Sequence, residues 1–382
     1  MKIKIAIINL TSGGISGGYL EYLLNIVPRI AMHKNVDSIL YAEPKELDIP
    51  NVFNNLNKVK KIFCNSYSPL RIMQDKELTK NLDDFKPDVI FIPLARYLKY
   101  KNIPIVTMLQ NMEPFVKREL LNSIKTNTKL FFQKIIGQRA LLKSDGIICL
   151  SKYVKNFMKN EFQIGDIKTS LIYHGINKNE DIDAQNDDAT DEFIFTAGSI
   201  RPARGLEDLI KASHLLKKND INIKIIIAGG VNSDSKEYLQ YLIKLIQQYK
   251  LSDSIKFLGK ISKNEMNWYY KNSKIFIMTS RVESFGMIAV EAMANGCFCI
   301  SSNSSCLPEI FTDSAFYYEA GDSVDLEQKI RSIINLSDLE INKKINRAIE
   351  RSSHFSWDVC SSKTVEFFIN IINQKNILNS KV

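Results

Sequence analysis

The most informative stretch of this sequence is Glu283-Ser284-Phe285-Gly286-Met287-Ile288-Ala289-Val290-Glu291. The apolar run before it, residues 274–279, is typical of a strand, and the residues after Gly286 are typical of a helix. Glu283 is therefore expected in the turn after the strand, beside a helix N-terminus whose free amide donors attract phosphates. Glu291 is expected about two turns into the helix, where a carboxylate has no capping role. Two carboxylates beside a phosphate-accepting turn suit a ligand that carries hydroxyls and phosphates, such as a sugar nucleotide.

This spacing resembles the E-x7-E motif of the retaining GT-B glycosyltransferases of family four, also called glycosyltransferases group 1. The resemblance continues through residues 292–296, 299–301 and 307–310, and it includes Ala197–Gly205 and Phe355–Trp357. It is specific over residues 190–360 and thinner in the N-terminal half. It implies an α/β fold of two Rossmann-like domains that face each other across a cleft, and transfer of a hexosyl group with retention.

Two domains are also expected from the length, because 382 residues exceed the size that one core usually serves. Short apolar runs alternate with longer amphipathic runs, which is the pattern of parallel α/β sheets. Residues 179–192 hold seven acids and no lysine or arginine, which predicts a linker. We therefore predict an N-terminal domain over residues 1–178 and a C-terminal domain over residues 193–355. The resemblance implies that the amphipathic helix 356–374 packs back on the N-terminal domain, which takes the acceptor, while the C-terminal domain takes the nucleotide sugar.

The apolar runs predict strands at residues 3–9, 36–42, 88–92, 103–109, 146–150, 170–173, 193–197, 223–228, 255–258, 274–279, 297–301 and 315–318. Helical periodicity is clearest at residues 17–32, 116–143, 205–218, 235–250, 286–295 and 356–374.

The composition limits the partners. A net charge of +9 favours anionic partners such as phosphorylated ligands or an anionic membrane face, although a lysine-rich surface explains it as well. No nucleic-acid partner is expected. The six cysteines show no CxxC spacing, so we expect buried reduced thiols, no zinc site and a cytoplasmic location. The N-terminus is typical of a first strand, and the chain lacks a run of about eighteen apolar residues, so any membrane contact is expected to be peripheral.

The stretch Ser12-Gly13-Gly14-Ile15-Ser16-Gly17-Gly18 follows the first predicted strand, leads into the first predicted helix and holds four glycines. They permit a phosphate-cradling loop. The dinucleotide-binding fingerprint is not matched, because Ile15 stands where its second glycine is required. The resemblance implies that Gly17 and Gly18 face the donor diphosphate; the alternative is a permissive turn.

Arg201 and Arg204 follow the predicted strand 193–197, where two guanidiniums can clamp a diphosphate. In the family this stretch usually begins with Gly-Arg and continues to Lys-Gly. Here Ser199 follows Gly198 in place of the arginine, and Arg204 takes the lysine position. The resemblance implies catalytic roles for both arginines and donor contacts for Gly198 and Ser199. Exposed loop arginines are the alternative.

The resemblance also implies that Glu283 is catalytic and reaches hydroxyls of the transferred sugar, while Glu291 binds the nucleotide ribose. Donor contacts are implied for the residues between them, which are Ser284, Phe285, Gly286 and Met287. The alternative is a pair of surface glutamates that flank a helix.

Gln110 and Asn111 follow the predicted strand 103–109, where many family members carry a His-Asp pair that contacts the donor sugar. An amide can hydrogen-bond a sugar hydroxyl but cannot shuttle a proton. We therefore expect donor binding here and no acid–base catalysis; a plain strand-end loop is the alternative. His174, near the domain boundary, is expected to be structural.

Asp181-Ile182-Asp183 matches the Asp-x-Asp metal motif of another glycosyltransferase fold, but it lies in the acidic linker instead of at a strand end. We expect no metal and no cofactor, with arginines and helix termini in place of a divalent cation. No residue stands out as a nucleophile, so the leaving phosphate itself is expected to deprotonate the acceptor.

Residues 116–143 hold seven basic side chains against the single acid Glu119, with apolar residues interleaved at helical spacing. A basic amphipathic helix of this kind can lie on anionic lipid. The alternative is a core helix with a lysine-rich solvent face.

Together these features predict a hexosyltransferase of polysaccharide biosynthesis, which moves sugar from a nucleoside-diphosphate sugar to a hydroxyl of a growing, lipid-linked surface glycan. One alternative is a nucleotide-sugar 2-epimerase, which shares the fold. Another is a catalytically inactive sugar-nucleotide-binding subunit, which the departures at Gln110 and Ser199 leave open.

Overall fold

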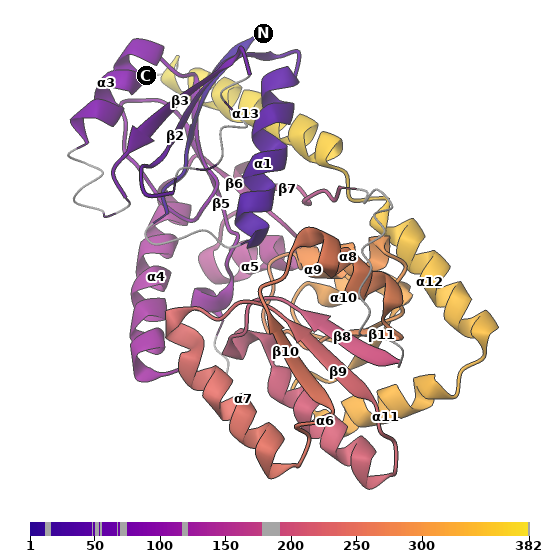
Figure 1. Ribbon diagram of the computed structural model, residues 1–382. Helices are drawn as coiled ribbons and strands as arrows, with labels where there is room; N and C mark the ends of the chain where they lie inside the picture. Colours follow the sequence, from indigo (N-terminus) through magenta and orange to yellow (C-terminus); the bar gives the residue numbers. More distant parts are fainter. Residues whose placement is uncertain are drawn as a thin grey trace. The chain divides into compact units, whose positions relative to one another are not determined.

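The computed structural model describes residues 1–11, 17–47, 49, 53, 56–66, 68, 75–116, 121–177 and 192–380. The chain folds into two compact units (Figure 1). The first unit comprises Met1–Asn111, Phe132–Gly175 and Ser356–Val382, and the second comprises Met112–Phe131 and Ile176–Phe355.

The first unit is built on a seven-stranded parallel sheet in the order β3-β2-β1-β4-β5-β6-β7. Its strands are β1 (Ile3–Ile8), β2 (Val36–Pro44), β3 (Val59–Cys64), β4 (Val89–Ile92), β5 (Ile105–Met108), β6 (Gly146–Cys149) and β7 (Thr169–Leu171). Its helices are α1 (Gly17–Met32), α3 (Lys76–Phe85), α5 (Lys152–Phe162) and α13 (Trp357–Asn379), together with the later part of α4 (Ile124–Lys143).

Helices cover both faces of this sheet, because successive strand residues point to opposite sides. One face, which includes Ile90 and Ile92, packs against Leu78 and Leu82 of α3. On the other face Phe91 meets Phe368 of α13, with ring centroids 5.1 Å apart. The last helix of the chain therefore completes the core of the first unit.

The second unit is built on a six-stranded parallel sheet in the order β10-β9-β8-β11-β12-β13. Its strands are β8 (Phe193–Ala197), β9 (Lys224–Ala228), β10 (Ile255–Gly259), β11 (Ile275–Met278), β12 (Cys299–Ser302) and β13 (Ala315–Tyr318). Its helices are α6 (Leu206–Lys218), α7 (Lys236–Gln248), α8 (Lys263–Asn272), α9 (Met287–Ala294), α10 (Leu307–Phe311), α11 (Ser323–Ile334) and α12 (Asp338–Ser352).

The two faces of this second sheet differ in chemistry. One is rich in isoleucine, including Ile194, Ile225 and Ile277, and packs against α6, α7 and α11. The other is aromatic: Phe195 stacks on Tyr269 of α8 with centroids 5.3 Å apart. Both sheets are of the parallel, doubly wound kind, which confirms the predicted α/β class with two Rossmann-like units.

Every predicted strand is confirmed, with small differences at the ends. The prediction missed β3, whose apolar pattern is broken by Lys60 and Lys61, and several helices, which are α3, α5, α8, α10, α11 and α12. The helix predicted from residue 116 begins only at Ile124; residues 121–123 are not helical, and 117–120 lie outside the described residues. The acidic stretch 178–191 also lies outside them.

Residues 112–131 group with the second unit, although the sequence analysis placed them in an N-terminal domain of residues 1–178. Two ion pairs link this segment to the second unit. Glu113 pairs with Arg201, and the ammonium of Lys129 lies 2.5 Å from the Asp234 carboxylate. These contacts attach a segment that comes early in the chain to the sheet formed later.

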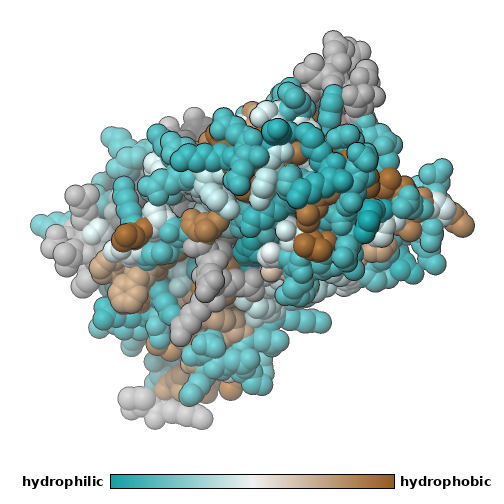
Figure 2. Space-filling model, turned by 90° about the horizontal axis from the view of Figure 1, so that it is seen from below, coloured by the Kyte–Doolittle hydropathy of each residue, from teal (hydrophilic) through white to brown (hydrophobic). Residues whose placement is uncertain are grey.

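The thiols are as the sequence predicts. All six cysteines are buried and carry free thiols. Hydrophilic side chains cover most of the face shown in Figure 2, and hydrophobic residues lie among them in small groups. None of the described helices is long and apolar enough to cross a membrane.

Candidate functional site

The second sheet has its topological switch point between β8 and β11. β8 lies beside β9 on one side and β11 on the other, so the chain leaves the two central strands in opposite directions. Open parallel sheets bind ligands at the carboxyl ends of the strands at such a point. Arg201 and Arg204 lie in the loop after β8, and Glu283 lies in the loop after β11. Three of the predicted site residues therefore come from the two loops that flank this point.

Arg204 and Glu283 form an ion pair there. Arg204 Nη1 donates to Glu283 Oε1 and also to Ser280 Oγ, at 3.0 Å. The side chains of the pair are only 14% and 11% exposed. Burial lowers the pKa of the Arg204 guanidinium, and the Glu283 carboxylate opposes that shift. Because water is largely excluded, this guanidinium can act strongly on a phosphate charge placed beside it.

Gly198 makes room for the guanidinium. A Cβ at this position would lie 2.9 Å from Cζ of Arg204, and its φ of +121° is one that side chains rarely adopt. Arg204 Nε is buried and makes no hydrogen bond within the described structure. The arginine thus lies flat against the backbone at the end of β8 and keeps an unused donor.

Arg201 is paired with Glu113, a buried residue just after Met112. The sequence analysis did not single out Glu113 as a functional residue. Each arginine of the predicted clamp therefore forms an ion pair with a carboxylate: Arg201 with Glu113 and Arg204 with Glu283. Ser199 lies half-buried in the same loop as Arg201.

The stretch from Glu283 to Glu291 forms the turn and helix that were predicted. Gly286 caps α9 with a φ of +87°, and Met287 is the first helical residue. Ser284 and Phe285 are buried, and the Phe285 ring packs edge-on against Phe355 at 5.4 Å. Because these residues are packed, the helix N-terminus after Gly286 is held firmly.

Glu291, the second carboxylate of the motif, lies half-buried in α9. Its Oε2 accepts a hydrogen bond of 3.2 Å from the hydroxyl of Tyr270, a buried residue of α8. Glu291 is therefore oriented by a neighbouring helix, as a ligand-binding carboxylate needs to be.

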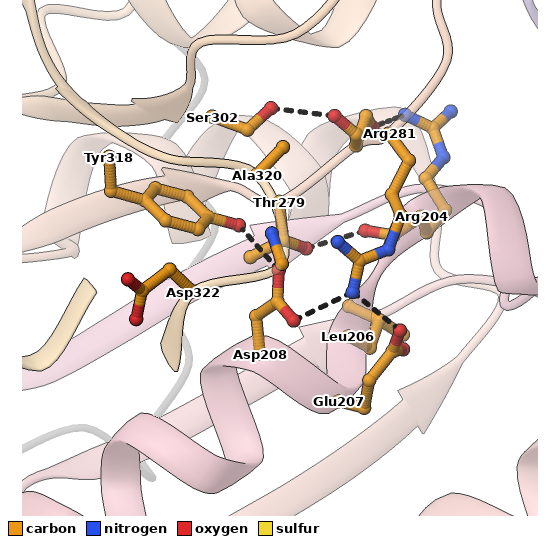
Figure 3. A network of polar contacts seen from close by, with 12 residues as sticks. Arg204, Leu206, Glu207, Asp208, Thr279, Arg281, Ser302, Tyr318, Ala320 and Asp322 are labelled. Atoms are coloured by element: carbon orange, nitrogen blue, oxygen red, sulfur yellow. Dashed lines mark hydrogen bonds and ion pairs between the residues drawn. The ribbon is translucent and has the colours of Figure 1, made fainter. Parts of the chain in front are cut away.

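Sequence reasoning missed Arg281, which lies in the loop after β11 and faces Glu207 and Asp208 (Figure 3). Its Nη2 donates to Glu207 Oε1 and to Asp208 Oδ1, both at 2.7 Å. Two signals could have identified it: an arginine directly after an apolar strand, and two acids in the helix that opens after Gly205.

The remaining predicted site residues lie in the first unit. Gly17 and Gly18 open α1 and are exposed, while residues 12–16 lie outside the described structure. Gln110 follows β5, and its Nε2 lies 3.3 Å from the sulfur of Met108; Asn111 next to it is exposed.

The sequence singled out two further features, His174 and Asp181-Ile182-Asp183. His174 is buried against Tyr22 and Trp357, and burial lowers its pKa to about 3, in keeping with the structural role expected for it. Asp181-Ile182-Asp183 lies outside the described residues. Among the residues that are described, no group of three or more His, Cys, Asp or Glu is arranged to hold a metal.

Comparisons with known proteins show the family of this chain. Residues 177–352 match the family model of glycosyl transferases group 1, and residues 17–180 match that of glycosyltransferase family 4. An uncharacterized glycosyltransferase of Methanocaldococcus jannaschii is 30% identical over 361 residues, which is 90% of this chain and 92% of the relative. The O-antigen chain mannosyltransferase of Salmonella typhimurium is 22% identical, over 87% of this chain and 92% of its own.

A solved structure shares the fold. The crystal structure of Anabaena HepE in complex with UDP and glucose superposes with a TM-score of 0.72 at 18% identity, covering 95% of this chain and 98% of that one.

Proposed function

Because this chain belongs to the glycosyltransferases of group 1, we propose that it is a retaining hexosyltransferase of polysaccharide biosynthesis. It moves a hexosyl group from a nucleoside-diphosphate sugar to a hydroxyl of a growing, lipid-linked surface glycan. The name of the Salmonella relative, a mannosyltransferase of the O-antigen chain, supports both the hexose and the surface glycan.

The Arg204–Glu283 pair at the switch point is the observation that carries this proposal. Expelling a nucleoside diphosphate from the anomeric carbon builds negative charge on the leaving phosphate. A preorganised guanidinium in a dry site stabilises that charge more than it stabilises the ground state. Glu283, held by Arg204, is oriented to accept hydrogen bonds from the hydroxyls of the transferred sugar.

The proposed reaction uses neither a protein nucleophile nor a metal. The bond from the anomeric carbon to the phosphate oxygen breaks, and a bond to the acceptor oxygen forms on the same face of the sugar. The acceptor proton passes to the leaving phosphate. Arg204 and Arg201 supply the positive charge that a divalent cation would otherwise provide.

Donor binding is assigned to residues of both units in this proposal. Glu291 takes the ribose, while the amides of residues Ser284–Met287, with Gly198 and Ser199, take the diphosphate and sugar. Gly17, Gly18, Gln110 and Asn111 contribute from the first unit, which also takes the acceptor.

Peripheral contact with the cytoplasmic membrane face is part of the same proposal. Ile124, Phe131 and Leu142 are 87%, 59% and 47% exposed, and their spacing of about two and five turns puts them on one face of α4. Exposed Lys125 and Arg139 flank this face. An apolar row beside cations is what an anionic bilayer surface binds.

The proposed function is tested by supplying radiolabelled nucleotide sugars, with and without a chelator, and following donor hydrolysis in the absence of acceptor. We expect slow hydrolysis that survives the chelator, with the anomeric configuration retained when the released sugar is observed by NMR. Binding without turnover would instead indicate an inactive sugar-nucleotide-binding subunit. Conversion of the donor to its 2-epimer would indicate an epimerase.

A further inference from the structure

Arg281 lies at the centre of a buried polar network in the second unit (Figure 3). Its side chain is 14% exposed, and those of Glu207 and Asp208 are 7% and 1% exposed. Tyr238 donates its hydroxyl to Glu207, and Tyr318 donates to Asp208 at 3.1 Å. The Asp208 carboxylate also accepts from the amide of Gly321 at 3.0 Å. Every charge in this network is therefore both paired and hydrogen-bonded.

The main chain of Arg281 is fixed on both sides. Its amide donates to the carbonyl of Ala203 at 2.8 Å, in the loop after β8. Its carbonyl accepts from the Ser304 hydroxyl at 2.5 Å, in the loop after β12. One residue thus joins the loops that follow three neighbouring strands.

The loops after β8 and β11 approach each other so closely at residue 205 that only glycine fits there. A Cβ on Gly205 would lie 2.6 Å from the carbonyl oxygen of Thr279 and 3.3 Å from Cγ of Arg281. Thr279 donates its hydroxyl to the carbonyl of Arg204 at 2.6 Å. The loop that carries Arg204 is therefore pressed directly against the loop that carries Glu283.

We propose that Arg281 is a positioning residue of the transfer reaction: by clasping Glu207 and Asp208 at the start of α6, it sets Arg204 against Glu283. The inference rests on the proposed function. Arg281 Nη2 donates to both Glu207 and Asp208, and the Arg281 amide holds Ala203, next to Arg204, so the proposed effect on the reaction passes through Arg204. A displacement of about 1 Å in a catalytic group can cost on the order of 100-fold in rate.

A variant that removes the clasp without leaving a buried unpaired charge separates positioning from stability. Arg281→Met alone would strand two buried carboxylates, which is strongly destabilising. The triple variant Arg281→Met/Glu207→Gln/Asp208→Asn removes all three charges. Its amide oxygens still accept from Tyr238, Tyr318 and Gly321. Arg347→Met, which breaks the exposed pair of Arg347 with Asp313, is the matched control.

The turnover experiment measures kcat and KM for donor hydrolysis, together with the thermal unfolding temperature. We expect the triple variant to unfold within a few degrees of wild type and to lose about 100-fold in kcat, with KM little changed. Adding Arg204→Ala to the triple variant should lower kcat by no more than about threefold further, because the two changes disable the same group. A triple variant with kcat close to wild type, or losses that multiply, would overturn the proposal.

A second measurement does not depend on activity. Amide hydrogen exchange of the ligand-free protein should become on the order of tenfold faster in residues 198–205 and 279–286 of the triple variant, and not in Arg347→Met. Faster exchange in a protein whose wild type turns over no nucleotide sugar would uphold the clasp and overturn the proposed function. Unchanged exchange in these loops would overturn the clasp.

Discussion

Arg204 lies where a buried cation does most for a leaving diphosphate. We predict that Arg204→Ala lowers kcat for donor turnover by about 100-fold or more while donor affinity changes by less than about tenfold, because phosphate charge grows toward the transition state. Steady-state kinetics with calorimetric donor titration measures both quantities. An effect confined to KM, with normal kcat, would mean that Arg204 binds ground state and transition state alike.

Glu291 is held by Tyr270 in a half-buried position suited to a ribose. We predict that Glu291→Ala weakens binding of the nucleotide sugar by about 10- to 100-fold, the range expected when a charged hydrogen-bond partner is lost. The thermal unfolding temperature should stay near that of wild type. Isothermal titration calorimetry measures the affinity, and Glu237→Ala, at an exposed position of α7, is the control. Donor affinity equal to that of the control would exclude the ribose role.

At the residue scale, the sequence predicts which residues lie at the strand ends but not which of them meet. Glu283 and the two arginines were identified from motif and position, yet the pairing of Arg204 with Glu283 joins residues 79 positions apart. The position of Arg281 after an apolar strand was a usable signal, but its pairing was not predictable, because its carboxylate partners lie 74 and 73 positions away. Long-range ion pairs leave no periodic trace in a sequence, so only the fold shows them.

At the scale of a single element, helix α4 is proposed to bind an anionic membrane surface. Lys129 is one of the seven basic residues counted in the stretch 116–143, but it pairs with Asp234. The charge-reversal test therefore uses Lys125→Glu and Arg139→Glu together, which change two exposed positions. We predict that wild type sediments with phosphatidylcholine–phosphatidylglycerol vesicles at low salt and is released at high salt. The double variant should not bind them, because surface cations are screened within about 10 Å at 0.1 M salt.

The control for this experiment reverses two exposed lysines elsewhere, Lys343 of α12 and Lys363 of α13. It changes the net charge equally and should still sediment with the vesicles. Donor hydrolysis should be the same in all three proteins. If wild type stays in the supernatant at low salt, α4 presents an ordinary solvated face, and a soluble acceptor becomes the better hypothesis.

Among the strands and helices, the buried ones were those that the sequence pattern predicted best. Strands such as β8 and β11 are continuous apolar runs because both faces of a parallel sheet are covered. By contrast, β3 carries lysines and the mean composition of α3 is polar, so neither has the pattern of a buried element. Elements at the margin of a sheet are specified by tertiary contacts more than by their own periodicity.

At the scale of the whole molecule, Gly175 is the point where the chain leaves the first unit, and its backbone packs closely against the start of α13. A Cβ there would lie 2.1 Å from the amide nitrogen of Trp357 and 2.5 Å from the carbonyl carbon of Ser356. We predict that Gly175→Ala lowers the free energy of unfolding by about 3 kcal/mol, because main chain cannot move aside as a side chain can. Gly165→Ala is the matched control, since a Cβ there would meet nothing within 4 Å.

Calorimetric unfolding measures both proteins, and the control should be as stable as wild type or slightly more so. Equal stability of the two variants would show that the start of α13 can shift without cost. The sequence analysis did not single out Gly175, because nothing in the local pattern indicates that the helix from residue 357 approaches it.

The return of α13 to the first unit has a consequence for the order in which the protein matures on the ribosome. Ile371 and Phe367 of α13 fill the space above Gly146, so the sheet formed by the earliest residues lacks part of its cover until the final helix has been synthesised. The second unit, by contrast, consists of the continuous stretch 176–355 and the segment 112–131, which leaves the ribosome before it. We therefore expect the first unit to complete its fold only after α13 has been synthesised, and we expect a nascent chain stalled before residue 356 to leave the apolar surface around Gly146 uncovered, where a chaperone can bind.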